Sequence, residues 1–183
     1  NAITADSATA WLKDHLAKHE SFVERFAAEA AQLARMDHQN IVRVRQTGPL
    51  GNEYYIEMEL IEGWDLSTWL KEHGRMPAEF AVLVLQRFAA GLQHAHERSI
   101  IHRDVKPGNV LLDEAGRPLL CDFGLVRDAE PSDHRSLTRS GSFVGTPNYW
   151  PPEQARGDLA AVGPRSDVYA LGATLHACLT GEP

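Results

Sequence analysis

The spacing of apolar residues predicts three helices in the first half of the chain. In residues 20–36 the apolar side chains recur every three or four positions, the period of one helix face, at Phe22, Phe26, Ala30 and Leu33. Residues 65–73 predict a short helix that Asp65 caps at its N-terminus. Residues 77–97 predict a long helix, whose apolar side holds Phe80, Leu83, Val84, Phe88, Leu92 and Ala95.

Two segments rich in β-branched and aromatic residues, 41–47 and 53–61, predict strands. The run at residues 48–52, which contains Gly and Pro, lies between them and predicts the turn of a hairpin. Residues 100–121 alternate short apolar runs around a second turn at 113–118, which indicates small strands.

The second half of the chain contains one very polar segment and one very apolar segment. Residues 128–145 are crowded with Ser, Thr and Arg, so we expect a mobile loop that has no means of burying itself. Residues 167–179 are almost wholly apolar, which predicts a helix buried on all sides.

Composition and charge exclude several classes of protein. A chain of 183 residues with 43% hydrophobic residues can form one globular domain with a sizeable core. The formal net charge of -7 argues against a nucleic-acid partner, which requires clustered Lys and Arg. Cys121 and Cys178 form no C-x-x-C pair, which favours a reducing, cytoplasmic setting.

The ends of the chain and its hydropathy bear on the whole protein. No apolar run reaches the roughly eighteen residues of a membrane span, so we expect no membrane contact within this segment. The chain starts without Met and ends within a turn, so we expect an excerpt of a longer protein, in which an anchor elsewhere stays open.

Two motifs carry the chemistry of the sequence. Residues 102–109 read His-Arg-Asp-Val-Lys-Pro-Gly-Asn, and residues 122–124 read Asp-Phe-Gly. In this order and at this separation they resemble the catalytic loop and the metal-binding motif of the protein kinases. The run Gln-Ala-Arg-Gly at residues 154–157 resembles bacterial members of that family, the eukaryotic-like serine/threonine kinases.

The resemblance implies a role for each polar residue of the two motifs. Asp104 would accept the proton of the substrate hydroxyl, while Asn109 and Asp122 would hold Mg²⁺ through hard oxygen ligands. Lys106 would contact the γ-phosphate of ATP, which is the arrangement in kinases that act on Ser and Thr. The catalytic residues are therefore expected to be Asp104, Lys106, Asn109 and Asp122.

Two other interpretations of these residues are weaker. Residues 102–109 could be a polar surface turn that is unrelated to residues 122–124. His94, His96 and His102 could be metal ligands, but His96 and His102 fall where the family has histidines that brace the catalytic loop. We expect structural histidines.

The resemblance extends to the residues that would bind ATP. Residues 26–42 resemble the helix αC of kinases and its exit, which makes Glu29 the partner of the lysine that anchors the phosphates. Aligned without a gap, Ala10 falls at that lysine, whereas a three-residue deletion makes it Lys13, which we prefer. The glycine-rich loop Gly-x-Gly-x-x-Gly, which covers the phosphates in the family, does not occur in this chain.

The adenine pocket is expected at the segment that joins the two lobes. Residues 55–63 resemble this hinge, with Met58 as the gatekeeper. Backbone groups of Glu59 and Ile61 would face the adenine edge, and Leu111 would lie under the purine ring.

The resemblance also covers the substrate-docking segment at residues 145–153, which ends in Pro-Pro-Glu where the family has Ala-Pro-Glu. Thr146 falls at the threonine of serine/threonine kinases that bonds to the catalytic aspartate and lysine. Asp167 matches the aspartate of helix αF that braces the catalytic loop, although a helix N-cap is also a reasonable role. The arginine that normally pairs with Glu153 is missing, so we expect Glu153 to be an unpaired buried charge.

These observations predict an α+β fold with the two lobes of a protein kinase, truncated at both ends. Residues 1–60 would form a partial N-lobe and residues 61–183 a partial C-lobe. The resemblance implies a serine/threonine protein kinase that uses ATP and Mg²⁺, acts on protein substrates, and leaves open a dimer for autophosphorylation. We expect this chain alone to be inactive and poorly soluble, because removal of terminal helices exposes apolar surface.

Two alternatives and one regulatory site complete the expectations. A pseudokinase or scaffold module fits the absent glycine-rich loop and the doubtful lysine, whereas the complete catalytic set argues against it. A small-molecule phosphotransferase of related fold would usually lack the docking segment. Thr138 and Ser140 fall where bacterial relatives carry paired activating phosphosites, next to the charge of Arg103.

Overall fold

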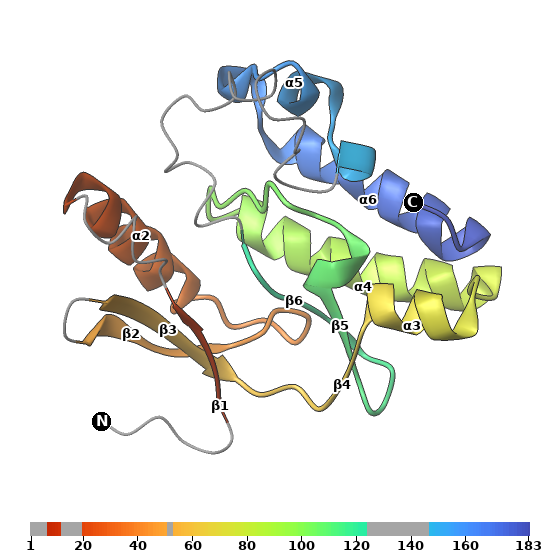
Figure 1. Ribbon diagram of the computed structural model, residues 1–183, viewed down its shortest axis with the longest axis horizontal. Coiled ribbons are helices and arrows are strands. Elements are labelled where there is room, and N and C mark those ends of the chain that lie inside the picture. The colour runs from red at the N-terminus through yellow and green to blue at the C-terminus, as the bar shows by residue number, and fades with distance from the viewer. Residues whose placement is uncertain (1–6, 12–19, 51–52, 124–146) are drawn as a thin grey trace.

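The computed structural model describes residues 7–11, 20–50, 53–123 and 147–183, and these form a mixed α and β structure (Figure 1). The first part is a three-stranded antiparallel sheet with the strand order β1-β3-β2. Its strands are β1 (Ser7–Trp11), β2 (Val44–Leu50) and β3 (Glu53–Glu59). Helix α2 (Glu20–Leu33) packs on this sheet through a small core of Phe26, Ala30 and Ile56. The predicted helical face is therefore confirmed at Phe26 and Ala30.

Strand β2 runs three residues further than the sequence indicated. Residues 48–50 were expected in the hairpin turn, yet Gly48, Pro49 and Leu50 pair with Tyr55, Tyr54 and Glu53. Because β2 is an edge strand, Pro49 can join it without removing a hydrogen bond that a central strand would need. The prediction of a turn at residues 48–50 was wrong for this reason.

The second part of the chain joins a small sheet to several helices. The sheet has the order β4-β5-β6, with β4 (Gly63–Asp65), β5 (Val110–Asp113) and β6 (Pro118–Leu120). The larger helices are α3 (Leu66–His73), α4 (Ala78–His96) and α6 (Pro164–Thr180), and Figure 1 shows α4 and α6 running side by side. Short elements complete this part: η1 (Pro107–Asn109), η4 (Pro147–Tyr149), α5 (Pro152–Ala155) and η5 (Leu159–Ala161).

The segment after α2 connects the two parts through backbone hydrogen bonds. The amide of Val42 donates to the carbonyl of Leu120 at 2.8 Å, and the amide of Leu120 donates to the carbonyl of Asn40 at 2.9 Å. The Asn40 side chain is buried, and its Nδ2 donates to the carbonyl of Pro118 at 2.7 Å. The exit of α2 is thus fixed to the strand that leads into the Asp-Phe-Gly motif.

Helices α3 and α4 begin and end close to where the sequence predicted them. Asp65 caps α3, since its Oδ1 accepts a hydrogen bond from the amide of Thr68 at 2.9 Å. One residue of the predicted apolar side of α4 is misplaced, because Leu83 is exposed while Leu85 is buried. The buried face of α4 consists of Ala81, Val84, Leu85, Phe88, Gly91, Leu92 and Ala95.

Helix α6 is not buried on all sides, which corrects the prediction from its apolar sequence. Val168 and Tyr169 are 60% and 51% exposed, and Leu179 lies on the open side as well. The opposite side, with Ala170, Thr174, Ala177 and Cys178, is buried. The apolar run therefore marks a helix with one packed face and one open apolar face in this chain.

No helix in the described ranges combines the length and the apolar character needed to cross a bilayer. The loop expected at residues 128–145 falls wholly within residues 124–146, which lie outside the described part of the chain.

Candidate active site

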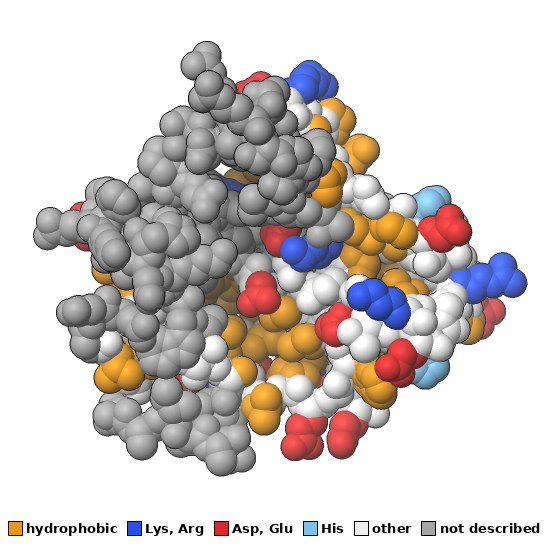
Figure 2. Space-filling model, viewed as in Figure 1, with side chains coloured by type: hydrophobic (Ala, Val, Ile, Leu, Met, Phe, Trp, Pro, Cys, Tyr) orange, Lys and Arg blue, Asp and Glu red, His pale blue; other side chains and the backbone are white. Residues whose placement is uncertain are grey.

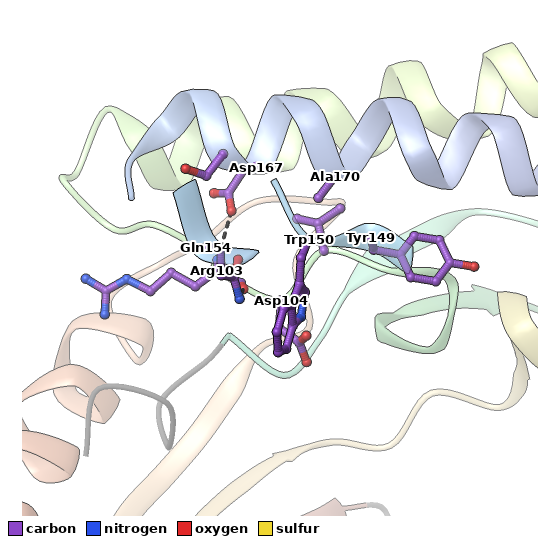
Figure 3. A pocket seen from close by; sticks show the side chains of 9 residues that line it. Arg103, Asp104, Tyr149, Trp150, Gln154, Asp167 and Ala170 are labelled. Carbon is purple, nitrogen blue, oxygen red and sulfur yellow. Dashed lines mark hydrogen bonds between the residues drawn. The ribbon is translucent and has the colours of Figure 1, made fainter. Parts of the chain in front are cut away.

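The motif His-Arg-Asp lies in a loop that Asp167 holds from α6. The two carboxylate oxygens of Asp167 accept hydrogen bonds from consecutive backbone amides, those of His102 and Arg103, each at 2.8 Å. Arg103 has a φ of 64°, in the left-handed region that non-glycine residues rarely adopt. This turn of the backbone aims both amides at one carboxylate, and Figure 3 shows Asp167 reaching from α6 to Arg103.

His96 provides a third donor to the same carboxylate. Its Nε2 lies 2.7 Å from Oδ2 of Asp167, whose side chain is 1% exposed. A buried carboxylate is costly unless hydrogen bonds compensate for the lost water, and here three donors do so. The bracing role expected for Asp167 and His96 is therefore seen directly, as contacts between α6, α4 and the loop.

His102 is a fully buried structural histidine. Its Nε2 lies 3.1 Å from the carbonyl of Cys121, and its ring centroid lies 4.6 Å from that of Phe123. Burial lowers the pKa of His102 and outweighs the opposing field of Asp167, so the ring is neutral near pH 7. The His-Arg-Asp and Asp-Phe-Gly motifs are thus packed directly on each other.

Asp104, Lys106 and Asn109 form one polar cluster. Lys106 Nζ lies 2.7 Å from Asp104 Oδ2, and both side chains are about one-fifth exposed, at 24% and 18%. Asn109 Nδ2 donates to the carbonyl of Asp104 at 2.8 Å and to its Oδ2 at 3.1 Å. Because its amide nitrogen faces Asp104, the amide oxygen of Asn109 points away from that residue.

Asp122 lies two residues after the end of β6 in the sequence, and its side chain is exposed. Its φ of 54° is also left-handed, which Asp tolerates better than most residues. The residue before Asp122 is hydrogen-bonded to the catalytic loop, since the amide of Cys121 donates to the carbonyl of Asn109 at 3.2 Å. Asp122 and the amide oxygen of Asn109 are hard oxygen donors, which fit Mg²⁺.

Three of the residues expected at the adenine pocket share one apolar cluster. Met58, Ile61 and Leu111 all pack against the buried side chains of Val42, Leu119 and Cys121. The amide of Glu59 donates to the carbonyl of Arg43 at 2.9 Å, so a purine contact at Glu59 would use its carbonyl. Figure 2 shows hydrophobic side chains in a central hollow, with carboxylates and a basic side chain at its border.

The structure describes Glu29 but not Lys13. Glu29 lines a cavity of about 190 Å³ together with Arg103 and Phe123, so α2 faces both motifs. Lys13 lies outside the described residues, and its role stays a prediction. Strand β1 pairs without a bulge, and its register sets Ala10 opposite Ile56.

The docking segment lies against the catalytic loop. A small hollow beside Asp104 is lined by Tyr149 and Trp150 from this segment, by Gln154 of α5, and by Ser166, Asp167 and Ala170 from α6 (Figure 3). Gln154 Nε2 donates to the carbonyl of Arg103 at 3.4 Å. Thr146 lies outside the described residues.

Glu153 is not an unpaired buried charge, which corrects the expectation drawn from its missing arginine. Its Oε1 accepts a hydrogen bond from Ser166 Oγ at 2.6 Å, and this bond lowers the pKa of Glu153. The side chain is also only partly buried. Ser166 therefore supplies one of the hydrogen bonds that an arginine would donate to Glu153. Its Oγ also accepts a hydrogen bond from the amide of Gly163.

Sequence reasoning missed the contacts of Ser166, Gln154 and Trp150. Ser166 lies thirteen residues from Glu153 and Gln154 lies 51 residues from Arg103, so no local pattern connects them. The phosphosites Thr138 and Ser140 lie outside the described residues and stay predictions.

Comparisons with known proteins agree with this geometry. The sequence pattern of the protein kinase domain matches residues 8–183. Serine/threonine-protein kinase PknL of Mycobacterium tuberculosis is 42% identical over 163 residues, which is 89% of this chain and 40% of that protein. Serine/threonine-protein kinase PrkC of Bacillus subtilis is 36% identical over 171 residues, which is 93% of this chain and 26% of that protein.

A solved structure resembles the fold over nearly the whole chain. The crystal structure of the PknI kinase domain of Mycobacterium tuberculosis matches with a TM-score of 0.76 and 28% identity, covering 97% of this chain and 64% of that one. The chain thus spans less than half of the two curated relatives above and less than two thirds of this kinase domain.

Proposed function

Because the chain belongs to the protein kinase family, we propose that the protein transfers the γ-phosphoryl group of MgATP to Ser and Thr hydroxyls of other proteins. The observation that carries this proposal is the cluster in which Lys106 and Asn109 both bond to Asp104. A carboxylate with fixed partners and partial exposure can meet a hydroxyl that arrives from solvent.

Asp104 acts as the proton acceptor in this proposal. The acceptor hydroxyl donates a hydrogen bond to Asp104, and its oxygen then bonds to the γ-phosphorus while the bond to the β-phosphate oxygen breaks. The proton goes to Asp104, and ADP leaves with the electron pair of the broken bond. Asn109 and Asp167 hold the loop so that Asp104 keeps its direction during this step.

Lys106 serves two partners in turn. At 2.7 Å from Asp104 Oδ2 its ammonium group pairs with that carboxylate, and the same group also suits the negative γ-phosphate. Asn109 and Asp122 would hold Mg²⁺, which would supply charge neutralisation of the phosphates. The purine would occupy the apolar cluster formed by Met58, Ile61 and Leu111.

The direct experiment is transfer from γ-labelled ATP to a mixture of protein acceptors, followed by hydrolysis and separation of the phosphoamino acids. We expect label on phosphoserine and phosphothreonine. Label confined to phosphotyrosine would contradict the assignment of acceptor, and binding of ATP without any transfer would replace this function with the alternative below.

The alternative is a pseudokinase that binds partners without phosphoryl transfer, and the sequence of β1 favours it. Strand β1 contains Ala10 and no lysine, and Lys13 lies beyond its last residue, Trp11. The two functions differ in the effect of Lys13→Met on the intact protein. For the kinase we expect kcat/KM to fall about a hundredfold, because the variant removes a charged contact to the phosphate that is transferred. Lys18→Met is the control and should leave kcat/KM unchanged.

The proposal also covers the two lobes of the domain, the cellular setting and the substrates. The two sheets support a division into lobes near residue 60. Free, buried Cys121 and Cys178 fit a reducing cytoplasm, where ATP is available. The proposed activity implies protein substrates. In a dimer, one copy of the protein would be the substrate of the other.

A further inference from the structure

A groove on the second sheet is lined in part by three aromatic side chains, those of Trp64, Trp69 and Phe80. It has a volume of about 500 Å³ and shares no lining residue with the hollow beside Asp104. Its walls are Gly63 and Trp64 of β4, Trp69 of α3, Phe80 of α4, and Leu112, Asp113, Glu114 and Gly116 of β5 and its turn. These elements lie at the right of Figure 1, across the chain from α2.

The aromatic rings are held in fixed positions. The ring of Trp69 stacks on His73 with centroids 4.7 Å apart and planes at 15°, and it lies 6.4 Å from the ring of Phe80. Trp64 meets the same His73 edge to face at 6.2 Å. Trp64 is nevertheless 45% exposed, so a large indole faces the groove and solvent without being covered.

Two glycines of the lining have positive φ angles that favour glycine. Gly116 has a φ of 73°, and a Cβ there would lie 3.7 Å from the ring of Phe80. Gly63 has a φ of 147°, and a Cβ there would lie 2.0 Å from the carbonyl of Leu112. Side chains at these positions would be strained, and the one at Gly116 would cover the edge of Phe80.

Two carboxylates belong to the lining of the groove, and Arg117 offsets the charge of one of them, Asp113. Asp113 and Glu114 line it, and no lysine or arginine does so in the part of the chain that the structure describes. Asp113 is held by Arg117, whose Nε lies 2.9 Å from Oδ2, and hydrogen bonds from Arg117 lower the pKa of Asp113 although burial opposes this. Glu114 is exposed and supplies the carboxylate at the rim.

We propose that this groove docks a basic, apolar segment of the protein substrate, with an arginine or lysine over Trp64 beside Glu114 and an apolar neighbour against Trp69 and Phe80. Indole faces attract cations, and a guanidinium also stacks on them. The nearby carboxylate adds attraction and disfavours acidic segments. That the partner is a substrate rests on the proposed kinase activity, whereas the binding itself does not.

The test is binding of a fluorescein-labelled peptide with two arginines followed by two leucines, measured by anisotropy on the intact protein. We expect Trp64→Ala and Glu114→Lys each to weaken binding about tenfold. The matched controls are Leu159→Ala, which removes an apolar side chain that is 52% exposed elsewhere, and Glu97→Lys at the far end of α4. Both should leave the affinity unchanged.

A second peptide, with glutamates in place of the arginines, should bind at least tenfold more weakly to the unaltered protein. Equal affinity for the two peptides, or equal losses in the control variants, would overturn the proposal. Circular dichroism of each variant confirms that folding is kept. The binding assay contains no ATP, so its result does not depend on phosphoryl transfer. A protein that binds the peptide here but transfers no label in the experiment with γ-labelled ATP would refute the kinase activity and leave the groove in place.

Discussion

At the scale of single residues, Asp167 is the point where α4, α6 and the catalytic loop meet. It receives the amides of His102 and Arg103 and the ring of His96. Removing the carboxylate would leave the buried amide of His102 and the partly buried amide of Arg103 without their acceptor, and each such loss is costly.

We therefore expect Asp167→Ala to lower the free energy of unfolding by about 3–5 kcal/mol, the usual effect of breaking a buried charged network. Urea denaturation measures it. Asp158→Ala, at an exposed position before η5, is the matched control and should change stability by less than about 0.5 kcal/mol. A similar small effect at Asp167 would mean that the loop is braced by something else.

His102 makes stability depend on pH. Because burial lowers its pKa in the folded protein, the unfolded chain binds more protons below about pH 6.5. Stability contributed by neutral His102 is thus present above that pH and is lost as the pH falls, by at most about 1.4 kcal/mol per unit.

The measurement is the urea midpoint of unfolding between pH 7.5 and pH 5.5. His102→Phe should flatten the decline relative to the unaltered protein, while the exposed His176→Gln should keep it. An identical decline in His102→Phe would show that other groups cause the acid sensitivity.

Residue roles were predictable where they sit inside a contiguous motif. The cluster of Asp104, Lys106 and Asn109 follows from eight consecutive residues, and the structure brings them together. The bond between Ser166 and Glu153 was missed, because it depends on how α5 and α6 approach each other. Such contacts between elements leave no periodic signal in the sequence.

At the scale of elements, α4 approaches β6 more closely at Gly91 than a side chain would allow. A Cβ on Gly91 would lie 2.8 Å from Leu120 Cδ1 and 3.0 Å from the carbonyl oxygen of Asn40. The backbone atom cannot move without loosening the contact between Asn40 and Leu120. Gly172 in α6, by contrast, has open space around it.

These two glycines form a matched pair for a stability test. Gly172→Ala should stabilise the protein by up to about 1 kcal/mol, because Ala is the better helix former. Gly91→Ala gains the same helix propensity but should destabilise by about 1–3 kcal/mol through overpacking. Thermal melts of both variants check the signs, and stabilisation by Gly91→Ala would contradict the close approach.

Elements were predictable wherever their hydrophobic period is regular. The sequence indicated α3 and α4 within a residue or two, because amphipathic spacing and the Asp65 cap are local signals. It misjudged β2, where an edge position tolerates Pro49, and α6, where apolar residues also occupy the open face. Both errors concern neighbours in space, which the local pattern does not contain.

At the scale of the whole molecule, we expect Arg103 to link the catalytic loop to the control of activity by phosphorylation. Its backbone is fixed by Asp167, and it lines the cavity that contains Glu29 and Phe123. A phosphate close to this guanidinium would form charge-assisted hydrogen bonds.

We expect the intact protein to be activated by phosphorylation at Thr138 and Ser140. Mass spectrometry of active protein should find both sites, and the double variant Thr138→Ala with Ser140→Ala should lose at least about tenfold in kcat/KM. Ser132→Ala is the control within the same segment. Full activity in the double variant would refute the regulatory role.

The most direct test of the account is Asp104→Asn in the intact protein, with turnover and ATP affinity measured on the same sample. Asn keeps the shape of the side chain but cannot accept the proton, so kcat should fall by about a hundredfold or more while the Kd for ATP changes less than about threefold. Near-normal turnover in Asp104→Asn would contradict the proposed chemistry.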